Sequence, residues 1–344
     1  MNYLQNLQSI DSTITYLMSL YLHPSISPSI IPSLPPSIRG IKSYPFGVTT
    51  NSSSGVISYE PFYPVFAAMQ SSGLVLNLHG ERPSASHSQS SDAITVLSAE
   101  SAFLPTLHNL HRLFPDLRIV LEHCTTAAAI DAVLQCGPNV VGTITPHHML
   151  ITVDDWVGDP HSFCKPVAKL PTDRQALLRA AMGLGFTPRD AVDQRETIVS
   201  ATGKFFLGSD SAPHLREAKC PPPPLSAADG CCSGEIKTAA GCFTQMNVTQ
   251  LVLEALEQGV ERGDLQRDEI KTRAIEAFVS SNGRAFYNLP PDVGTRKYVK
   301  GKGIKVRQRL PVGADAAEKW VVPFWAGREL RWHLVEESSS SLEV

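Results

Sequence analysis

Four residues of the types that bind metal ions or move protons each stand at or just beyond the end of a separate apolar segment. They are Lys42, His79, His123 and Asp210. Zinc takes imidazole nitrogen and carboxylate oxygen directly as ligands, whereas buried His and Asp are costly without partners. Taken singly, such a histidine is more often a hydrogen-bonded core or loop residue, and a lysine is usually solvated. Four together, each at the end of its own segment, indicate a metal site.

The apolar segments have the length and composition of buried strands and alternate with helical patterns. Such repeated βα units predict an α/β fold with a parallel sheet. In a parallel barrel the carboxyl ends of the strands form the catalytic face, so the four residues should converge there. The predicted strands are residues 14–22, 40–43, 74–78, 118–122, 140–144 and 204–208, and the predicted helices include 61–71, 125–134, 173–181 and 249–257.

The composition is that of an ordinary globular protein. The 344 residues are 42% hydrophobic and 18% charged with a formal net charge of -3, which gives no electrostatic reason to expect a nucleic-acid partner. No stretch reaches the roughly 18 apolar residues of a membrane span. The N-terminal apolar run has no basic region ahead of it, unlike a secretory signal. We therefore expect a cytoplasmic protein with a small-molecule substrate and no membrane partner.

Proline-rich and cysteine-containing segments bear on the domain organisation. Residues 24–36 are interpreted as a loop rather than a linker, so residues 1–335 are expected to form one domain, followed by a disordered tail at 336–344. Residues 220–241 are expected to form a long surface loop beside the active site. Seven cysteines, an odd number, suit reduced thiols. The four near this loop lack a C-x2-C pair, which argues against a structural zinc site: Cys220, Cys231, Cys232 and Cys242.

Short sequence motifs make a family resemblance specific. GIKSYP, TTNSSSG, NLHGE, LEHCTT, ITPHHM, GSDSAPH and AAGCF occur in this order, and their order and spacing resemble those of the bacterial and fungal dihydroorotases. The similarity runs from about residue 14 to residue 332, where VVPFWAGRELRW is similar to the closing segment of that family. The resemblance implies a zinc-dependent amidohydrolase with a TIM-type (β/α)8 barrel, and a homodimer.

The resemblance also implies a binuclear zinc site bridged by a carbamate on Lys42. An unmodified ammonium cannot bind zinc, whereas a carbamate offers one oxygen to each of two metals. His79 and His123 resemble the remaining ligands of the second metal. Asp210 resembles the ligand of the first metal, which also moves the proton between the bridging hydroxide and the substrate nitrogen. Two metals would polarise the carbonyl and supply hydroxide near neutral pH.

Further residues correspond to substrate contacts of the family. Thr49 and Thr50 match a mobile loop that closes over the substrate, and His214 matches a contact to the substrate carboxylate. Ala240 and Lys165 would contribute mainly backbone groups. At Lys165 the bacterial proteins tend to carry an apolar residue, which puts a side-chain role there in doubt. His148 is also similar to the family, in a structural role at its strand end or in a catalytic one.

The sequence departs from the family at its beginning. Family members start with a strand ending in His-x-His-x-Arg, whose histidines hold the first metal and whose arginine binds the substrate carboxylate. No such motif is present here, so the barrel is expected to lack about its first two βα units and to hold about six strands. One zinc is then expected rather than two, with doubtful activity of this chain alone and exposed strand edges.

The first hypothesis for function is a dihydroorotase, which interconverts N-carbamoyl-L-aspartate and L-dihydroorotate in pyrimidine synthesis. Two alternatives remain. One is a catalytically impaired remnant that acts as a binding or interaction protein. The other is a mononuclear amidohydrolase acting on another cyclic amide, which turnover of hydantoin or dihydrouracil without dihydroorotate would favour.

Overall fold

The structure is a computed structural model that describes residues 2–49, 52–83, 94–185, 199–221, 238–291, 294–313 and 319–335. Several predictions concern residues outside these ranges: the substrate contact Thr50, the cysteines Cys231 and Cys232, and the disordered tail at residues 336–344.

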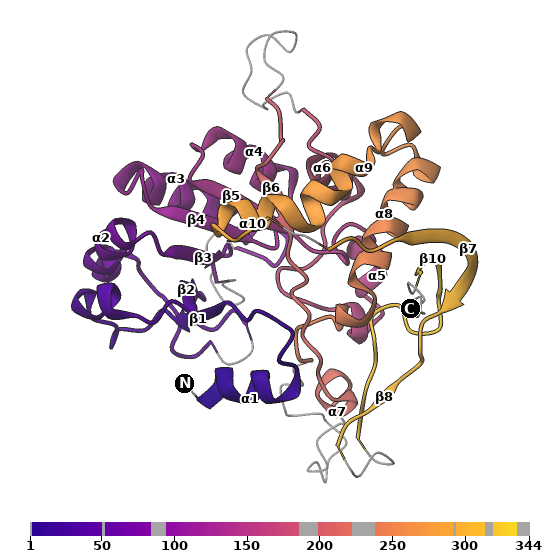
Figure 1. The fold of residues 1–344 in the computed structure, drawn as a ribbon, viewed down its shortest axis with the longest axis horizontal. Helices are drawn as coiled ribbons and strands as arrows, with labels where there is room; N and C mark the ends of the chain where they lie inside the picture. The colour runs from indigo at the N-terminus through magenta and orange to yellow at the C-terminus, as the bar shows by residue number, and fades with distance from the viewer. Residues whose placement is uncertain are drawn as a thin grey trace, which may run out of the picture.

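Six parallel strands form the central sheet, in the order β1-β2-β3-β4-β5-β6 (Figure 1). Each strand pairs with the next along the chain, as in a TIM-type barrel, and β1 and β6 are the edges of the described sheet. All six correspond to predicted strands, although the first begins at Met18 instead of residue 14 because its pairing to β2 begins there, opposite Ile38. The strands are β1 Met18–Tyr21, β2 Ile38–Ser43, β3 Val75–His79, β4 Arg118–Glu122, β5 Val140–Ile144 and β6 Phe205–Leu207.

Helices α2, α3, α4 and α6 follow strands of the sheet and cover its outer side (Figure 1). Local signals set their ends: the Thr126 hydroxyl accepts a hydrogen bond from the backbone N–H of Ala129 at the start of α4, and Gly73 ends α2 with a φ of 67°. The α-helices are α1 Asn2–Ile10, α2 Tyr63–Ser72, α3 Leu104–Leu113, α4 Ala127–Gln135, α5 Val153–Trp156, α6 Pro171–Ala181, α7 Arg216–Lys219, α8 Val248–Arg262, α9 Thr272–Glu276 and α10 Asn282–Phe286. None of the described helices is long and apolar enough to cross a membrane.

The two faces of the sheet carry separate apolar clusters, as the alternation of side chains along a strand requires. Ile119 and Leu121 of β4 belong to the large core between sheet and helices. Val120, between them, packs instead with Val75, Val141 and Phe206 in a smaller cluster. The smaller cluster also contacts Phe286 and Tyr287. This interior cluster leaves the carboxyl ends of the strands free to carry polar groups.

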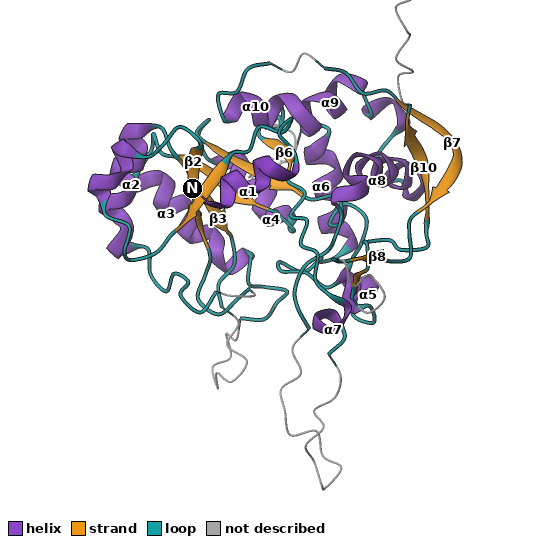
Figure 2. Cartoon of the chain, turned by 60° about the horizontal axis from the view of Figure 1, so that its bottom comes forward, coloured by secondary structure: helices purple, strands orange, loops and turns teal. Residues whose placement is uncertain are grey.

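Two antiparallel pairs near the C-terminus were not predicted from the sequence. β7 (Tyr298–Lys305) pairs with β10 (Glu329–Leu334), and β8 (Leu310–Pro311) pairs with β9 (Trp320–Val321). Figure 2 shows β7 and β10 beside α8. Arg331 of β10 donates hydrogen bonds to Glu254 of α8, so the β7–β10 pair is held against this helix.

Candidate functional site

The four residues first singled out come from the carboxyl ends of four strands. Lys42 lies on β2, His79 ends β3, and His123 directly follows β4. Asp210 lies three residues after β6. His123 and Asp210 both have a positive φ, 45° and 40°, a backbone conformation that is uncommon outside glycine and costs energy. Strained backbone of this kind clusters at functional sites, which agrees with the position of both residues at this edge.

Three of the four residues line one cavity of about 420 Å³: Lys42, His123 and Asp210. His79 is buried beside them, with its ring centroid 4.6 Å from that of His123. The structure therefore brings the predicted metal ligands together at one edge of the sheet. The ligand atoms of His79, His123 and Asp210 do not form a group within 4.8 Å of one another in the described part of the chain.

Lys42 lies in an environment that favours its neutral form. Burial lowers the pKa of its ammonium, while the negative charges of Glu122 and Asp210 oppose that shift. Its Nζ lies 5.2 Å from the ring centroid of Tyr44, and among the described residues it forms no ion pair within 4.0 Å. A neutral amine is the form that reacts with carbon dioxide, so this environment suits the carbamate that the family resemblance implies.

The two histidines are held differently. His79 Nε2 lies 2.7 Å from Oε2 of Glu81, and both side chains are buried. A carboxylate on one ring nitrogen fixes the tautomer and leaves the other nitrogen, Nδ1, for a metal. His123 Nδ1 is buried with no partner. Burial lowers the pKa of His123 well below its usual value, and His79 and Lys42 lower it further. A neutral imidazole with a free nitrogen is the form that binds metal.

Asp210 supplies one of the acidic groups of the cavity. Its side chain is reached by solvent through the cavity, yet the surrounding protein removes part of its hydration and raises its pKa. The nearby His147 and Lys42 oppose this shift. A carboxyl whose pKa moves toward neutrality is a better proton carrier near pH 7.

Sequence reasoning missed the carboxylates that surround these residues. Glu122 also lines the cavity and accepts hydrogen bonds from Asn77 Nδ2 at 2.8 Å and from Thr143 Oγ1 at 2.6 Å. The same Thr143 hydroxyl accepts a bond from the backbone N–H of His123 at 2.7 Å. Glu81 and Glu122 each stand within two residues of a predicted ligand. That adjacency was the signal available in the sequence.

The predicted substrate contacts gather around a different cavity. Thr49, Lys165 and Ala240 line a space of about 890 Å³ together with Trp156. His214 belongs to this group, because its Nε2 lies 3.0 Å from the backbone oxygen of Ala240. The two cavities share no lining residue. The structure thus brings the metal candidates together and most of the substrate candidates together, but around two separate cavities.

Other cysteines and histidines lie near this edge. His148, for which a structural or a catalytic role was expected, is buried with Nδ1 2.6 Å from Thr145 Oγ1 and Nε2 2.9 Å from Pro166 O. Within the described ranges, one group of three residues has its ligand atoms all within 4.8 Å of one another: His147, His148 and Cys164. Cys220 and Cys242 do not belong to this group.

No family model matches the chain. Among curated proteins, a probable dihydroorotase from Schizosaccharomyces pombe is 42% identical over 334 residues, covering 97% of this chain and 83% of the relative. The dihydroorotase of Saccharomyces cerevisiae is 38% identical over 343 residues, covering 96% and 83%. A solved structure of the S. cerevisiae dihydroorotase in complex with 5-fluoroorotic acid superposes with a TM-score of 0.78 at 36% identity, covering 97% and 84%. An L-hydantoinase from Arthrobacter aurescens, at 15% identity and a TM-score of 0.65, shares the fold.

Proposed function

Because the chain belongs to the dihydroorotase family, we propose that it interconverts N-carbamoyl-L-aspartate and L-dihydroorotate, the cyclic amide of pyrimidine synthesis. One observation of the structure carries this proposal. Lys42, His123 and Asp210, from three different strand ends, line a single cavity with His79 packed against His123. These are the positions at which the sequence matches the family's metal and proton-transfer residues.

The donor groups of the cavity fit zinc. His123 has a buried nitrogen without a partner, Glu81 leaves one nitrogen of His79 free, and burial favours the neutral amine of Lys42. Lys42 as a carbamate, His79 and His123 would hold one zinc, and the carbamate and Asp210 would contribute to a second. Bound zinc would polarise the substrate carbonyl and lower the pKa of water. With three protein ligands for one metal and two for the other, we expect close to one zinc in this cavity.

Asp210 is the proposed proton carrier. In the hydrolytic direction, a water oxygen adds to the ring carbonyl carbon, the carbon–nitrogen bond breaks, and the nitrogen gains a proton. The ionised Asp210 takes the proton from the attacking water and delivers it to the departing nitrogen, so that the residue ends the cycle unchanged. Cyclisation is the same sequence reversed. Its raised pKa makes the carboxylate a stronger base toward the attacking water.

Residues of the second cavity are proposed to hold the substrate. His214 would face the substrate carboxylate, and Thr49 and Thr50 would lie on the loop that covers it. Ala240 and Lys165 would offer backbone groups. The contact between His214 Nε2 and Ala240 O supports this, because it fixes the direction of the imidazole. We also propose that the chain forms a homodimer and is located in the cytoplasm.

A turnover assay on the purified chain with added zinc tests the proposed function. We expect slow dihydroorotate hydrolysis that is above the level of the Asp210→Asn variant, since one of the two metal positions has few ligands. Hydantoin and dihydrouracil serve as comparison substrates and should not be turned over faster. Dihydroorotate binding with no turnover above the variant would instead identify a binding protein, and preferential hydantoin turnover would identify a different cyclic amidohydrolase.

A further inference from the structure

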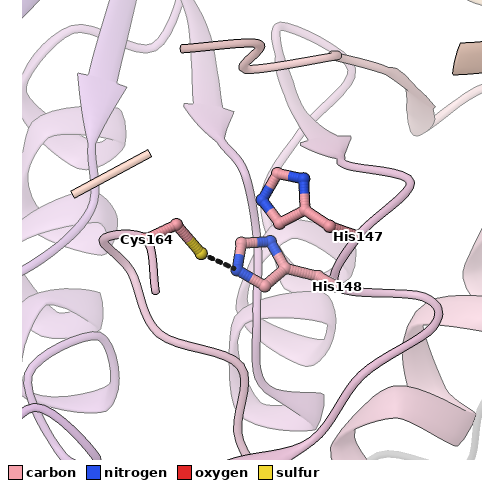
Figure 3. Close-up of side chains that lie close together, drawn as sticks. All are labelled: His147, His148 and Cys164. Carbon is pink, nitrogen blue, oxygen red and sulfur yellow. Dashed lines mark hydrogen bonds between the residues drawn. The ribbon is translucent and has the colours of Figure 1, made fainter. Parts of the chain in front are cut away.

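A second group of metal-ligating side chains lies at the end of β5, separate from the four residues of the proposed catalytic site. His147 and His148 follow the strand, and Cys164 approaches them from a later loop (Figure 3). The three side chains are 0%, 2% and 1% exposed, and their ligand atoms all lie within 4.8 Å of one another. We propose that these three residues form a thiolate-containing site for a zinc-like cation, with ligands other than those of the proposed catalytic site.

His147 carries the strongest sign of an absent partner. Both of its ring nitrogens are buried and neither has a hydrogen-bond partner. Its ring packs 4.3 Å from that of His148 and 5.9 Å from that of Phe324, centroid to centroid. An unpaired nitrogen in such surroundings costs stability, and a metal ion bound to one of them would offset that cost.

Cys164 and His148 already face each other, with Sγ 3.4 Å from Nε2 (Figure 3). Both also contact the backbone oxygen of Pro166, at 3.2 Å for the sulfur and 2.9 Å for the nitrogen. Metal binding would exchange these contacts for two metal–ligand bonds. The thiol would release its proton to solvent, and His148 would free Nε2 by keeping its proton on Nδ1, as a donor to the Thr145 hydroxyl 2.6 Å away.

The chemistry of the donors selects the class of ion. One sulfur and two imidazole nitrogens suit zinc and other borderline or soft ions, and exclude magnesium and calcium, which take oxygen ligands. The neighbouring Cys242 thiol and burial both raise the pKa of Cys164 well above its usual value. The cation therefore has to displace a firmly held proton, so binding should weaken as the pH falls.

Cobalt(II) as a probe distinguishes this site from the proposed catalytic one. The proposed catalytic ligands include no cysteine, so a sulfur-to-cobalt charge-transfer band in the near ultraviolet reports thiolate ligation alone. The metal-free 344-residue chain titrated with cobalt(II) should develop this band until one thiolate-bound cobalt is present, in addition to the cobalt that the catalytic cavity takes. Cys164→Ser should abolish it, and His147→Gln should weaken binding by about 10-fold or more. Cys136→Ser, at a buried cysteine elsewhere in the fold, should leave it unchanged.

Three results would overturn the site: no band in the unmodified chain, a band that survives Cys164→Ser, or equal affinity in His147→Gln. Should Cys164→Ser fail to fold, as judged by circular dichroism, the His147→Gln titration decides alone. The cobalt titration does not measure dihydroorotate turnover. Its result can therefore fail or succeed separately from the turnover assay that tests the proposed function.

Discussion

Oε2 of Glu81 lies 2.7 Å from Nε2 of His79, and the two side chains are 2% and 1% exposed. A buried carboxylate at this distance holds the imidazole in one orientation and one tautomer. With Nε2 occupied by Glu81, Nδ1 is the nitrogen of His79 that remains for a metal. The arrangement makes Glu81 a positioning residue for the proposed zinc site, although it does not line the cavity itself.

Substituting Glu81 should weaken zinc binding. Glu81→Ala leaves His79 free to rotate and to change tautomer, so we expect zinc affinity in the catalytic cavity to fall about 10- to 100-fold. Glu81→Gln keeps a hydrogen-bonding group of the same size and should lose less. Competition with a chelator of known affinity measures both variants, with the exposed Glu60→Gln as the matched control. Unchanged affinity in Glu81→Ala would remove the positioning role.

Replacing Lys42 should remove the metal of the catalytic cavity. Lys42→Ala deletes the group that would carry the carbamate, and two histidines without a third ligand bind zinc poorly. Zinc analysis of purified protein should show the loss, and Lys302→Ala, at an exposed lysine of β7, should show none. Native mass measurement of the chain without substitutions should reveal the added mass of a carbamate, which disappears on acid treatment. Zinc content that is unchanged in Lys42→Ala, measured with Cys164→Ser as the background, would refute the assignment.

Asp210→Asn separates proton transfer from metal binding. The amide preserves the size of the side chain and tolerates the left-handed backbone at this position, but it cannot accept the proton. We expect dihydroorotate turnover to fall by about 10²-fold or more, with the zinc held by His79, His123 and Lys42 still present. Steady-state kinetics and zinc analysis on the same preparation check both parts. Turnover equal to that of the unmodified chain would exclude Asp210 from the mechanism.

Glu257 predicts a specific acid dependence of stability. Hydrogen bonds from Arg267, together with the Lys300 ammonium, lower its pKa from 4.5 to about 2. Because the folded pKa lies below the unfolded one, the stabilisation is complete above about pH 4.5 and is lost as the pH falls toward 2. Both cationic partners are substantially exposed, so we expect Glu257→Gln to cost only about 1–2 kcal/mol at pH 7.

Urea unfolding at several pH values between 7 and 3 measures this contribution. The difference in unfolding free energy between the unmodified chain and Glu257→Gln should shrink as the solution becomes more acidic. Glu60→Gln, which lies on the surface, should differ little from the unmodified chain throughout. A Glu257→Gln difference that stays constant over the whole range would show that the ion pairs contribute nothing.

The strands were predictable, and the metal candidates could be singled out, because each has a strong local signal. A buried parallel strand is a short apolar run, and Lys42, His79, His123 and Asp210 stand out at or after the ends of such runs. β7 carries no such signal. Most residues of its sequence, YVKGKGIK, are exposed, and lysine and glycine alternate within it. Its pairing with β10 depends on residues about thirty positions away, which local periodicity does not report.

The finer arrangement of the site also lay beyond the sequence. Glu122 of β4 accepts a hydrogen bond from Asn77 of the neighbouring strand β3. This contact follows from the register of the two strands, which pairs His79 with Glu122. Register is set by the packing of whole strands and not by any single motif. The predicted residues are divided between two cavities because loops carry them there. The conformation of a loop depends on partners far away in the sequence, as His214 contacts the backbone oxygen of Ala240.

The consecutive strand order has a consequence for how the chain folds during synthesis. Every strand of the sheet pairs with the one made just before it, so each new βα unit finds its partner already present. The loops to be closed are one unit long, and their entropic cost grows only slowly with length. The bonds from Arg331 to Glu254 span 77 residues and form only after the closing segment has left the ribosome. The strand order therefore allows the sheet to grow in the direction of synthesis, with the β7–β10 pair joining α8 afterwards.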